Sequence, residues 1–466
     1  MNNSFDKDSK ASRALVHRPE RHHLTGEEAE AQYRSRLSKR HTLRIALRNG
    51  LYAAIGRILI GILKQLAKKG LSRAFLQRVR GEVLSLDPIK WAFVFGGFSC
   101  YRLCVQLLTR LADALRLPHK SVSFFSGCIC SLPALVMNKT TRTELSLYMF
   151  VRAAHAFALR FVLPRLPLSL QRFDHYDTLL MCLSSVQICY GCMFAPFTMP
   201  PSYQNFLSQA STYDRRFFRA YIGYMRGHTA PEMVDLSVEK GWELFNGHSQ
   251  ESVNRLCEYT HKGYTCNGWI LHFIPINMLR VGIPLYGPLK FFMLVTGGQK
   301  KLRQHPTTTL LRALKSVLTS ALFLALYVSI FIRSACFSIH MGYRGGLRTS
   351  LLGSLAGLAT LLEPKGRRMD LALYCAMYAL RSFLLTQNRL GHLPYPRHWF
   401  VFSTYLASMG FMLYEYEEEP KLLNPRVRSA MKLLLGERAG KSHVSRLGAG
   451  HADATPEKES EAKSVA

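Results

Sequence analysis

Two stretches of this chain match each other. Residues 123–159 read SFFSGCICSLPALVMNKTTRTELSLYMFVRAAHAFAL, and residues 349–385 read TSLLGSLAGLATLLEPKGRRMDLALYCAMYALRSFLL. They align without a gap at a constant offset of 226 residues, since 349 − 123 = 226. Leucine matches are common in apolar helices, but charged, glycine and tyrosine matches in register are not. Such matches are Gly127/Gly353, Lys139/Lys365, Arg142/Arg368 and Tyr148/Tyr374, with the conservative pair Glu144/Asp370. The sequence therefore predicts an internal duplication.

Apolar runs surround both copies of this stretch. They have about the length that crosses a bilayer as a helix, near 20 residues. Four lie near 90–110, 121–137, 143–163 and 178–198, and four near 313–335, 348–362, 370–386 and 397–416. The predicted fold is an all-α integral membrane protein of two homologous four-helix units, residues 90–200 and 306–420. Residues 201–300 connect the units and contain a Cys/His element.

The flanking segments differ in composition from these units. Residues 1–41 and 436–466 are polar and lack apolar periodicity, so we expect disordered tails. Residues 42–70 carry apolar residues at helical spacing with basic residues on another side. This pattern predicts a basic amphipathic helix, which either lies in the interface of an anionic membrane or packs against the protein's own bundle. Neither a secretory signal peptide nor a peroxisomal C-terminal address is expected.

The charge and cysteine content narrow the class of protein. The net charge is +31, from 61 Lys and Arg against 30 Asp and Glu. Basic residues gather at the ends of the apolar runs, where lipid phosphates would lie, so membrane lipids are the predicted partners. Nucleic acid is not, because no recognition motif is present. The eleven cysteines are scattered along the chain and several lie within apolar runs, which indicates reduced, packed side chains rather than a disulfide framework.

Each copy has a basic loop between its second and third helices, with the pattern K-x-x-R-x-[E/D]-L-x-L-Y. A carboxylate in the first turn of helix three favours the helix N-terminus, and a neighbouring arginine at headgroup depth suits a structural role. The alternative is that the loops bind lipid headgroups. The residues concerned are Lys139, Arg142, Glu144, Lys365, Arg368 and Asp370.

The connecting segment contains a candidate metal site. Cys257, His261 and Cys266 lie within ten residues and are ligands that zinc prefers. Structural zinc normally takes four ligands, and only the more distant His248 and His272 are available as a fourth. The alternative is a small folded loop in which Cys257 pairs with Cys266.

Motifs that would indicate an enzyme are missing. The sequence has no phosphate-binding loop, no dinucleotide glycine fingerprint, no HExxH and no nucleophile elbow. We therefore expect no catalytic residues and no cofactor other than the zinc considered above.

The Cys/His element, followed by IPLYGPLKFF (283–292) and His305-Pro306, resembles the cysteine-rich region of the transmembrane protein 135 family. The string LATLLEPKGRRMDLALYCAMYALRSF (358–383) is similar to that family's membrane hairpin. The family is related to four-helix proteins of the mitochondrial inner-membrane translocase. The resemblance implies a non-catalytic multi-pass protein of peroxisomes or mitochondria that acts in membrane organisation, organelle dynamics or lipid homeostasis. The alternative is a solute or polypeptide conduit in the same membrane.

Overall fold

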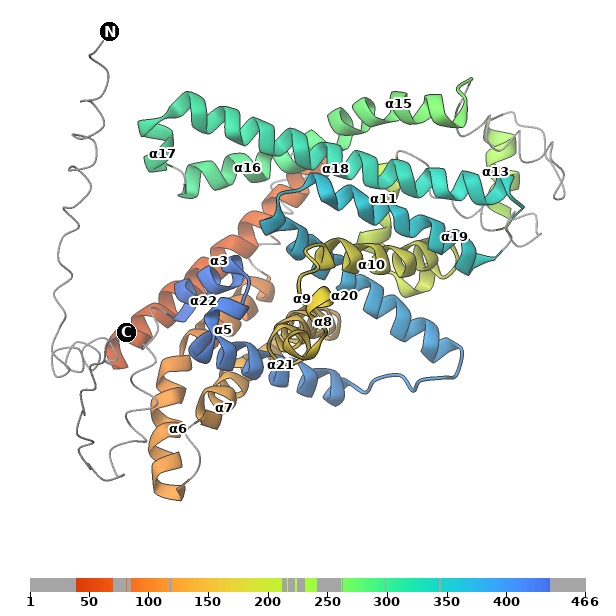
Figure 1. Ribbon diagram of the computed structural model, residues 1–466. Coiled ribbons are helices and arrows are strands. Elements are labelled where there is room, and N and C mark those ends of the chain that lie inside the picture. The colour runs from red at the N-terminus through yellow and green to blue at the C-terminus, as the bar shows by residue number, and fades with distance from the viewer. Residues whose placement is uncertain are drawn as a thin grey trace, which may run out of the picture. The chain divides into compact units, whose positions relative to one another are not determined.

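The computed structural model describes most of the chain between residues 39 and 435. The described ranges are 39–69, 85–116, 120–211, 231–240, 263–297, 299–342 and 345–435, with the single residues Gly81, Arg216, Gly223 and His261. Within these ranges every regular element is a helix and none is a strand, which confirms the all-α prediction (Figure 1). The predicted tail 436–466, nearly all of 1–41 and much of the segment between 212 and 260 lie outside them.

The described residues fall into two compact units, which do not follow the predicted division into 90–200 and 306–420. Unit 1 comprises residues up to Met137 together with those from Met409 onward, and unit 2 comprises Asn138–Ser408. The difference arises because the fourth helix of each predicted copy packs against helices of the other copy.

Unit 1 begins with α3 (Lys39–Lys69), which runs along α5 (Leu86–Ser99). After α5 the chain bends by 44° at Cys100 and continues as α6 (Tyr101–Leu115). Helix α6 packs against α7 (Lys120–Ser131). The predicted helix at 42–70 is therefore present, and in the described structure it packs against the bundle.

The C-terminal part of α21 (His398–Glu418) returns to α7 in unit 1. A Cβ atom on Gly127 would lie 2.9 Å from the Cα of Gly410, so the two backbones touch. The short helix α22 (Pro425–Leu435) closes the unit, since Asn49 donates hydrogen bonds to the Leu434 carbonyl and to Ser99. The glycines at positions 127 and 410 thus let α7 and α21 approach each other closely.

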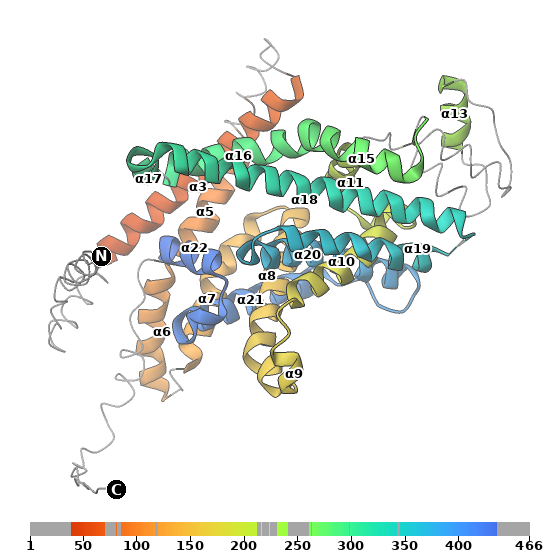
Figure 2. The same cartoon turned by 45° about the horizontal axis from the view of Figure 1, so that its top comes forward.

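Unit 2 is built around the long helix α18 (Pro306–His340). Along one side run α15 (Cys266–Asn277), the π-turn η5 (Met278–Gly282) and α16 (Ile283–Gly297) (Figure 2). This stretch stays helical although it contains Pro275, Pro284 and Pro288, which normally interrupt a helix. Proline has no backbone N–H to donate, and the helix widens to a π-turn between Pro275 and Pro284, where its regular hydrogen-bond pattern changes.

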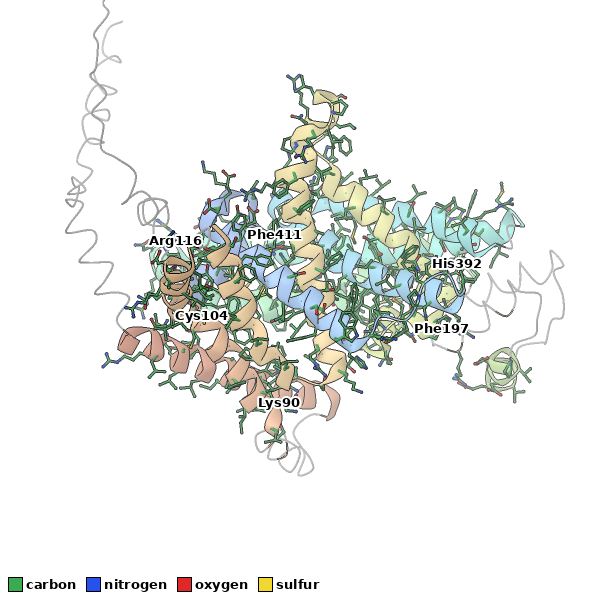
Figure 3. The ribbon with its side chains drawn as sticks, turned by 90° about the horizontal axis from the view of Figure 1, so that it is seen from below. Lys90, Cys104, Arg116, Phe197, His392 and Phe411 are labelled. Atoms are coloured by element: carbon green, nitrogen blue, oxygen red, sulfur yellow. The ribbon has the colours of Figure 1, made fainter. Side chains whose placement is uncertain are left out.

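The other side of α18 packs against α19 (Gly346–Gly353) and the 3-10 helix η6 (Ser354–Leu362). Helix α10 (Tyr176–Met193) lies against α19, η6 and α20 (Lys365–Arg389). Their apolar core includes Ile188, Tyr203, Tyr327 and Ala372. At one end of this unit the Arg389 guanidinium lies 4.3 Å from the ring centroid of Phe197, and His392 lies at the same end (Figure 3). Unit 2 thus joins helices from both predicted copies.

Four helices in the described ranges are long and apolar enough to cross a membrane. They are Thr42–Ile62, Lys139–Arg165, Cys266–Phe291 and Pro306–His340, and the bent pair Leu86–Ser99 and Tyr101–Leu115 is a fifth if it forms one span. The eight predicted spans overlap this set only in part. Thr42–Ile62 and Cys266–Phe291 are candidate spans that were not among the eight predicted ones. Conversely, α10, α20 and α21 were predicted as spans but are not long and apolar enough to be counted.

Matched segments of the sequence have matched helix boundaries. Helix α7 and the following 3-10 helix η1 (Leu132–Val136) occupy 120–136, and α19 with η6 occupies 346–362, the same interval 226 residues later. The next helices begin at Lys139 and Lys365, again 226 apart. The helix before each pair ends at a left-handed residue, Arg116 (φ 54°) and Gly342 (φ 66°), with the same separation.

Candidate functional site

Charged side chains are buried where α8 (Lys139–Phe157) crosses α20 in unit 2. Arg152 Nη2 lies 3.1 Å from Asp370 Oδ1, and the two side chains are only 10% and 12% exposed. The Arg152 guanidinium also lies over the Tyr148 ring, 4.7 Å from its centroid. Charges buried to this extent are stable only when they are paired.

A second ion pair at this crossing mirrors the first. Arg381 Nη1 on α20 lies 3.8 Å from Glu144 Oε1 on α8. Glu144 and Asp370 are the matched acidic residues of the two aligned segments, and each contacts an arginine on the opposite helix. The second pair is longer and more exposed, at 23% and 42%, than the first. Each helix therefore contributes one acidic residue and one arginine to the crossing, and the pair with Asp370 is the more deeply buried of the two.

Several polar atoms at this crossing remain unsatisfied within the described structure. The buried Nε atoms of Arg152 and Arg381 and the Nε2 atom of His155 have no hydrogen-bond partner there, nor has the Oγ1 of Thr386. Buried polar groups usually have a partner, so these atoms are exceptions within the described structure.

Both basic stretches predicted as loops are helical, because α8 begins at Lys139 and α20 at Lys365. The charged residues of the second stretch contact other parts of the protein. Lys365 forms an ion pair with Asp174, and Arg368 donates hydrogen bonds to the carbonyls of Leu361 and Glu363. The Lys365 ammonium holds the pKa of the Asp174 carboxyl below its usual value. With Asp370 paired to Arg152, all three predicted loop residues have protein partners. Their arrangement suits a structural role.

The matching stretch of the first copy, at the beginning of α8, makes fewer contacts with the rest of the protein. Asn138 caps α8 by accepting a hydrogen bond from the Thr141 backbone N–H at 2.8 Å. Glu144 contacts Arg381, but Lys139 and Arg142 have no ion-pair partner among the described residues, and Lys139 is exposed. Only this stretch therefore leaves its lysine and arginine available to an outside anion.

Unit 1 holds a further buried ion pair. Arg102 Nη1 on α6 lies 2.9 Å from Glu417 Oε1 on α21, with the side chains 10% and 8% exposed. Tyr101 and Glu415 beside them are fully buried. A pair this enclosed holds α21 to α6 and leaves neither charge uncompensated.

The described residues of the Cys/His element contact α18. His261 Nε2 lies 3.5 Å from the Cys336 sulfur, and the Cys266 sulfur lies 3.9 Å from His340 Nε2. Burial lowers the pKa of His261 to about 4, helped by the nearby charges of Arg333 and His340, so the ring is neutral at physiological pH. Neither Cys266 nor Cys336 forms a disulfide.

The predicted zinc ligands are thus only partly accounted for. Cys257 and the alternative ligand His248 lie outside the described ranges. The other alternative, His272, stacks on Tyr264 at 4.8 Å between ring centroids. In the part of the chain that the structure describes, no three His, Cys, Asp or Glu side chains converge closely enough to hold a metal.

Sequence reasoning missed the partners that α18, α20 and α21 supply: Cys336, His340, Arg381 and Glu417. One signal was available for the first two. In the stretch SACFSIH (334–340), Cys336 and His340 stand four apart, which places them on one face of a helix. The other two residues are more than 200 positions from their partners, and no local pattern points to them.

Comparison with known proteins yields no relative. No family model, no curated protein and no solved structure matches this chain.

Proposed function

We propose that this protein is a multi-pass α-helical membrane protein of peroxisomes or mitochondria with no catalytic activity. It organises the membrane and supports organelle dynamics or lipid homeostasis through contacts with lipids and proteins. The membrane assignment rests on helix α3, which exposes a stripe of large apolar side chains. The organelle and the role in lipid homeostasis rest on the resemblance of the hairpin at 358–383 and of the Cys/His element.

Helix α3 exposes a stripe of large apolar side chains, together with Arg44 and Arg48 near its start, and buries small and polar side chains on the opposite face. The outward side chains are spaced by four residues along the helix and are 45–67% exposed: Leu43, Leu47, Leu51, Ile55 and Leu59. The face against the bundle carries Thr42, Ala46 and Asn49, which are buried. A water-soluble helix has the opposite arrangement. Moving this stripe from water into lipid is worth on the order of 10 kcal/mol.

Other segments carry the same character. The continuous stretch of α15, η5 and α16 exposes Leu271, Leu279, Leu289 and Phe291. The short segments 120–136 and 346–362 also suit a bilayer, because 3-10 turns rise about 2 Å per residue. Each is therefore about 28–30 Å long, close to the thickness of the hydrocarbon core.

The proposal includes an internal duplication. Its support is the aligned sequence at an offset of 226, the helix starts at the same offset (120 and 346, 139 and 365) and the left-handed residues Arg116 and Gly342. Downstream, the 3-10 helices Pro196–Thr198 and Pro420–Leu422 start 224 residues apart, as do the helices after them, Pro201–Ser211 and Pro425–Leu435. Because each fourth helix packs with the other copy, the duplicated halves cannot fold independently.

Membrane insertion and location can be tested together. The tagged chain should stay with the membrane pellet after carbonate washing and should be imaged with peroxisomal or mitochondrial markers. Release into the aqueous fraction would refute the membrane assignment. Retention in the pellet with staining of the secretory pathway would refute only the organelle.

Lipid contact at the basic stretch of the first copy leads to a prediction. Replacing Lys139 and Arg142 with alanine should lower the amount of anionic phospholipid that co-purifies in mild detergent, because each basic residue contributes about 1 kcal/mol near an anionic surface. Native mass spectrometry of the bound lipids measures the effect. Lys365→Ala is the matched control, since Asp174 already pairs with that ammonium, and it should retain the lipid. Equal losses in the two variants would contradict the assignment of lipid binding to the first stretch.

A second candidate function is a conduit for a solute. The reciprocal ion pairs and unsatisfied donors at the α8–α20 crossing favour it, because duplicated transporters bind their substrates where the repeats meet. Solute flux or ion conductance in liposomes containing only this protein, abolished by Asp370→Asn, would support the conduit. Sealed liposomes with correctly folded protein would support the non-catalytic organising role.

A further inference from the structure

The connection between α20 and α21 exposes a group of large apolar side chains. Residues 389–400 form this α20–α21 segment, in which every residue except Pro396 is exposed. The large apolar side chains of the segment are 40–65% exposed: Leu390, Leu393, Tyr395, Trp399 and Phe400. Apolar side chains exposed this close together indicate a contact with a membrane or with another protein rather than with water.

Hydrogen bonds within the chain hold the beginning of this segment in one conformation. Helix α20 ends where Gly391 takes a left-handed conformation, with φ 78°. The Gln387 carbonyl accepts hydrogen bonds from the backbone N–H groups of His392 and Leu393, at 3.0 and 3.4 Å. The Asn388 side chain donates to the Leu393 carbonyl at 2.9 Å. A surface that is ordered before it binds loses less conformational entropy on binding, so this turn is suited to a contact.

The charge of the segment indicates an anionic partner. Arg389 begins the segment and Arg397 lies near its end, and both side chains are exposed. The Arg389 guanidinium lies 4.3 Å from the ring centroid of Phe197, at one end of unit 2 (Figure 3). The sequence has no acidic residue between Asp370 and Glu415. The segment therefore combines its exposed apolar side chains with a net positive charge, which favours an anionic surface.

The backbone of the segment indicates its depth in a bilayer. Residues 390–397 lie between the two helices and are not helical. Irregular backbone is not tolerated against the hydrocarbon core, because no water is present there to bind its N–H and C=O groups. Large apolar side chains are in turn unfavourable in bulk water. Both parts of the segment are accommodated at the level of the lipid headgroups, where tryptophan and tyrosine are enriched and arginine reaches phosphate.

We propose that the α20–α21 segment is an interfacial anchor that binds anionic phospholipids. The rings of Tyr395 and Trp399 lie at the level of the headgroups, and Arg389 and Arg397 bind lipid phosphates. The inference rests on the membrane location proposed above and adds the lipid class and the depth of one end of unit 2. An anchor here fixes where α20 and α21 meet the membrane surface, which their own length and composition do not, since neither is a candidate span.

Fluorescence quenching of Trp399 tests this proposal. Trp91, Trp242 and Trp269 are replaced by phenylalanine, and the full-length protein is reconstituted in liposomes of phosphatidylcholine and phosphatidylglycerol, with one of the two lipids brominated. We expect bromines near the headgroup end of the acyl chains to quench more than bromines near the methyl end. Brominated phosphatidylglycerol should quench more than brominated phosphatidylcholine at equal mole fraction. The difference in quenching between wild type and Trp399→Phe gives the same measurement without the three replacements.

Arg389→Ala/Arg397→Ala should lower the preference for phosphatidylglycerol about fivefold or more, the effect of losing at least one basic residue near an anionic surface. Lys365→Ala is the matched control, because Asp174 pairs with that ammonium, and it should keep the preference. Far-UV circular dichroism checks the folding of each variant.

Quenching of Trp399 by water-soluble acrylamide and by neither brominated lipid, in protein that floats with the liposomes, would overturn the anchor and leave the membrane location intact. This is the result expected of a surface that contacts another protein. Equal quenching by the two brominated lipids in the wild type would overturn the assignment of anionic lipid. Protein that does not associate with the liposomes would overturn both the anchor and the proposed membrane location.

Discussion

Replacing Arg152 with alanine should lower the free energy of unfolding by about 3–5 kcal/mol. The substitution leaves the Asp370 carboxylate, 12% exposed, without its arginine at 3.1 Å. An uncompensated buried charge costs more than the pair itself contributes, because the desolvation penalty remains when the attraction is lost. Unfolding by SDS in mixed micelles, followed by circular dichroism, measures the change.

The mirrored pair supplies the control for this prediction. Arg381→Ala removes the arginine that pairs with Glu144, but that pair is 3.8 Å long and partly exposed, so about 1 kcal/mol or less should be lost. The double variant Arg152→Ala/Asp370→Asn should recover part of the loss of the single variant, because no buried charge is left. Equal losses for Arg152→Ala and Arg381→Ala would contradict the inequality of the two pairs.

Replacing Gly357 with leucine should destabilise unit 2 by at least about 3 kcal/mol. A Cβ atom at this position would lie 2.6 Å from both the backbone N and the Cα of Cys182, so α10 itself would have to move away from η6. Backbone atoms cannot rotate aside as a flexible side chain does. Small residues at such contacts let helices approach closely in a membrane, where packing rather than hydrophobicity drives association.

Gly366→Leu is the matched control, because nothing lies within 4 Å of the Cβ position of Gly366 in the first turn of α20. Its effect should stay within about 0.5 kcal/mol, the range usual for surface positions. The same SDS titration compares the two variants. A fully stable Gly357→Leu protein would show that α10 and η6 do not pack as closely as described.

Local features of the fold could be predicted from the sequence. The short second helices expected at 121–137 and 348–362 occupy 120–136 and 346–362, because apolar content and the polar residues after them mark both ends. The predicted place of Glu144 and Asp370 in the first turn of helix three is wrong, because α8 begins at Lys139 and α20 at Lys365, so that neither first turn contains an acidic residue. Apolar periodicity and helix-end signals depend on residues that are close together in the sequence, so they can be recognised without the structure.

Long-range pairing could not be predicted in the same way. The ion pair of Arg152 with Asp370 joins residues 218 positions apart, and no local pattern links them. The helix through Pro275 and Pro284 cannot be expected from the sequence either, since prolines normally interrupt a helix and the intervening π-turn has no sequence signature. No local pattern places the Cys336 sulfur beside His261. Tertiary packing decides each of these cases.

Spin labels along the exposed apolar stripe of α3 test most directly whether this helix is inserted in the membrane. Single cysteines replace Leu43, Leu47, Leu51, Ile55 and Leu59 in turn, and the labelled protein is placed in lipid bilayers. Helix residues Thr42–Ile62 extend about 31 Å, enough to cross the hydrocarbon core. We predict that collisions with oxygen peak near Leu51 and decline toward both ends, while collisions with a water-soluble nickel chelate show the reverse. Free access of the chelate to all five labels, or one constant depth along the helix, would contradict the claim.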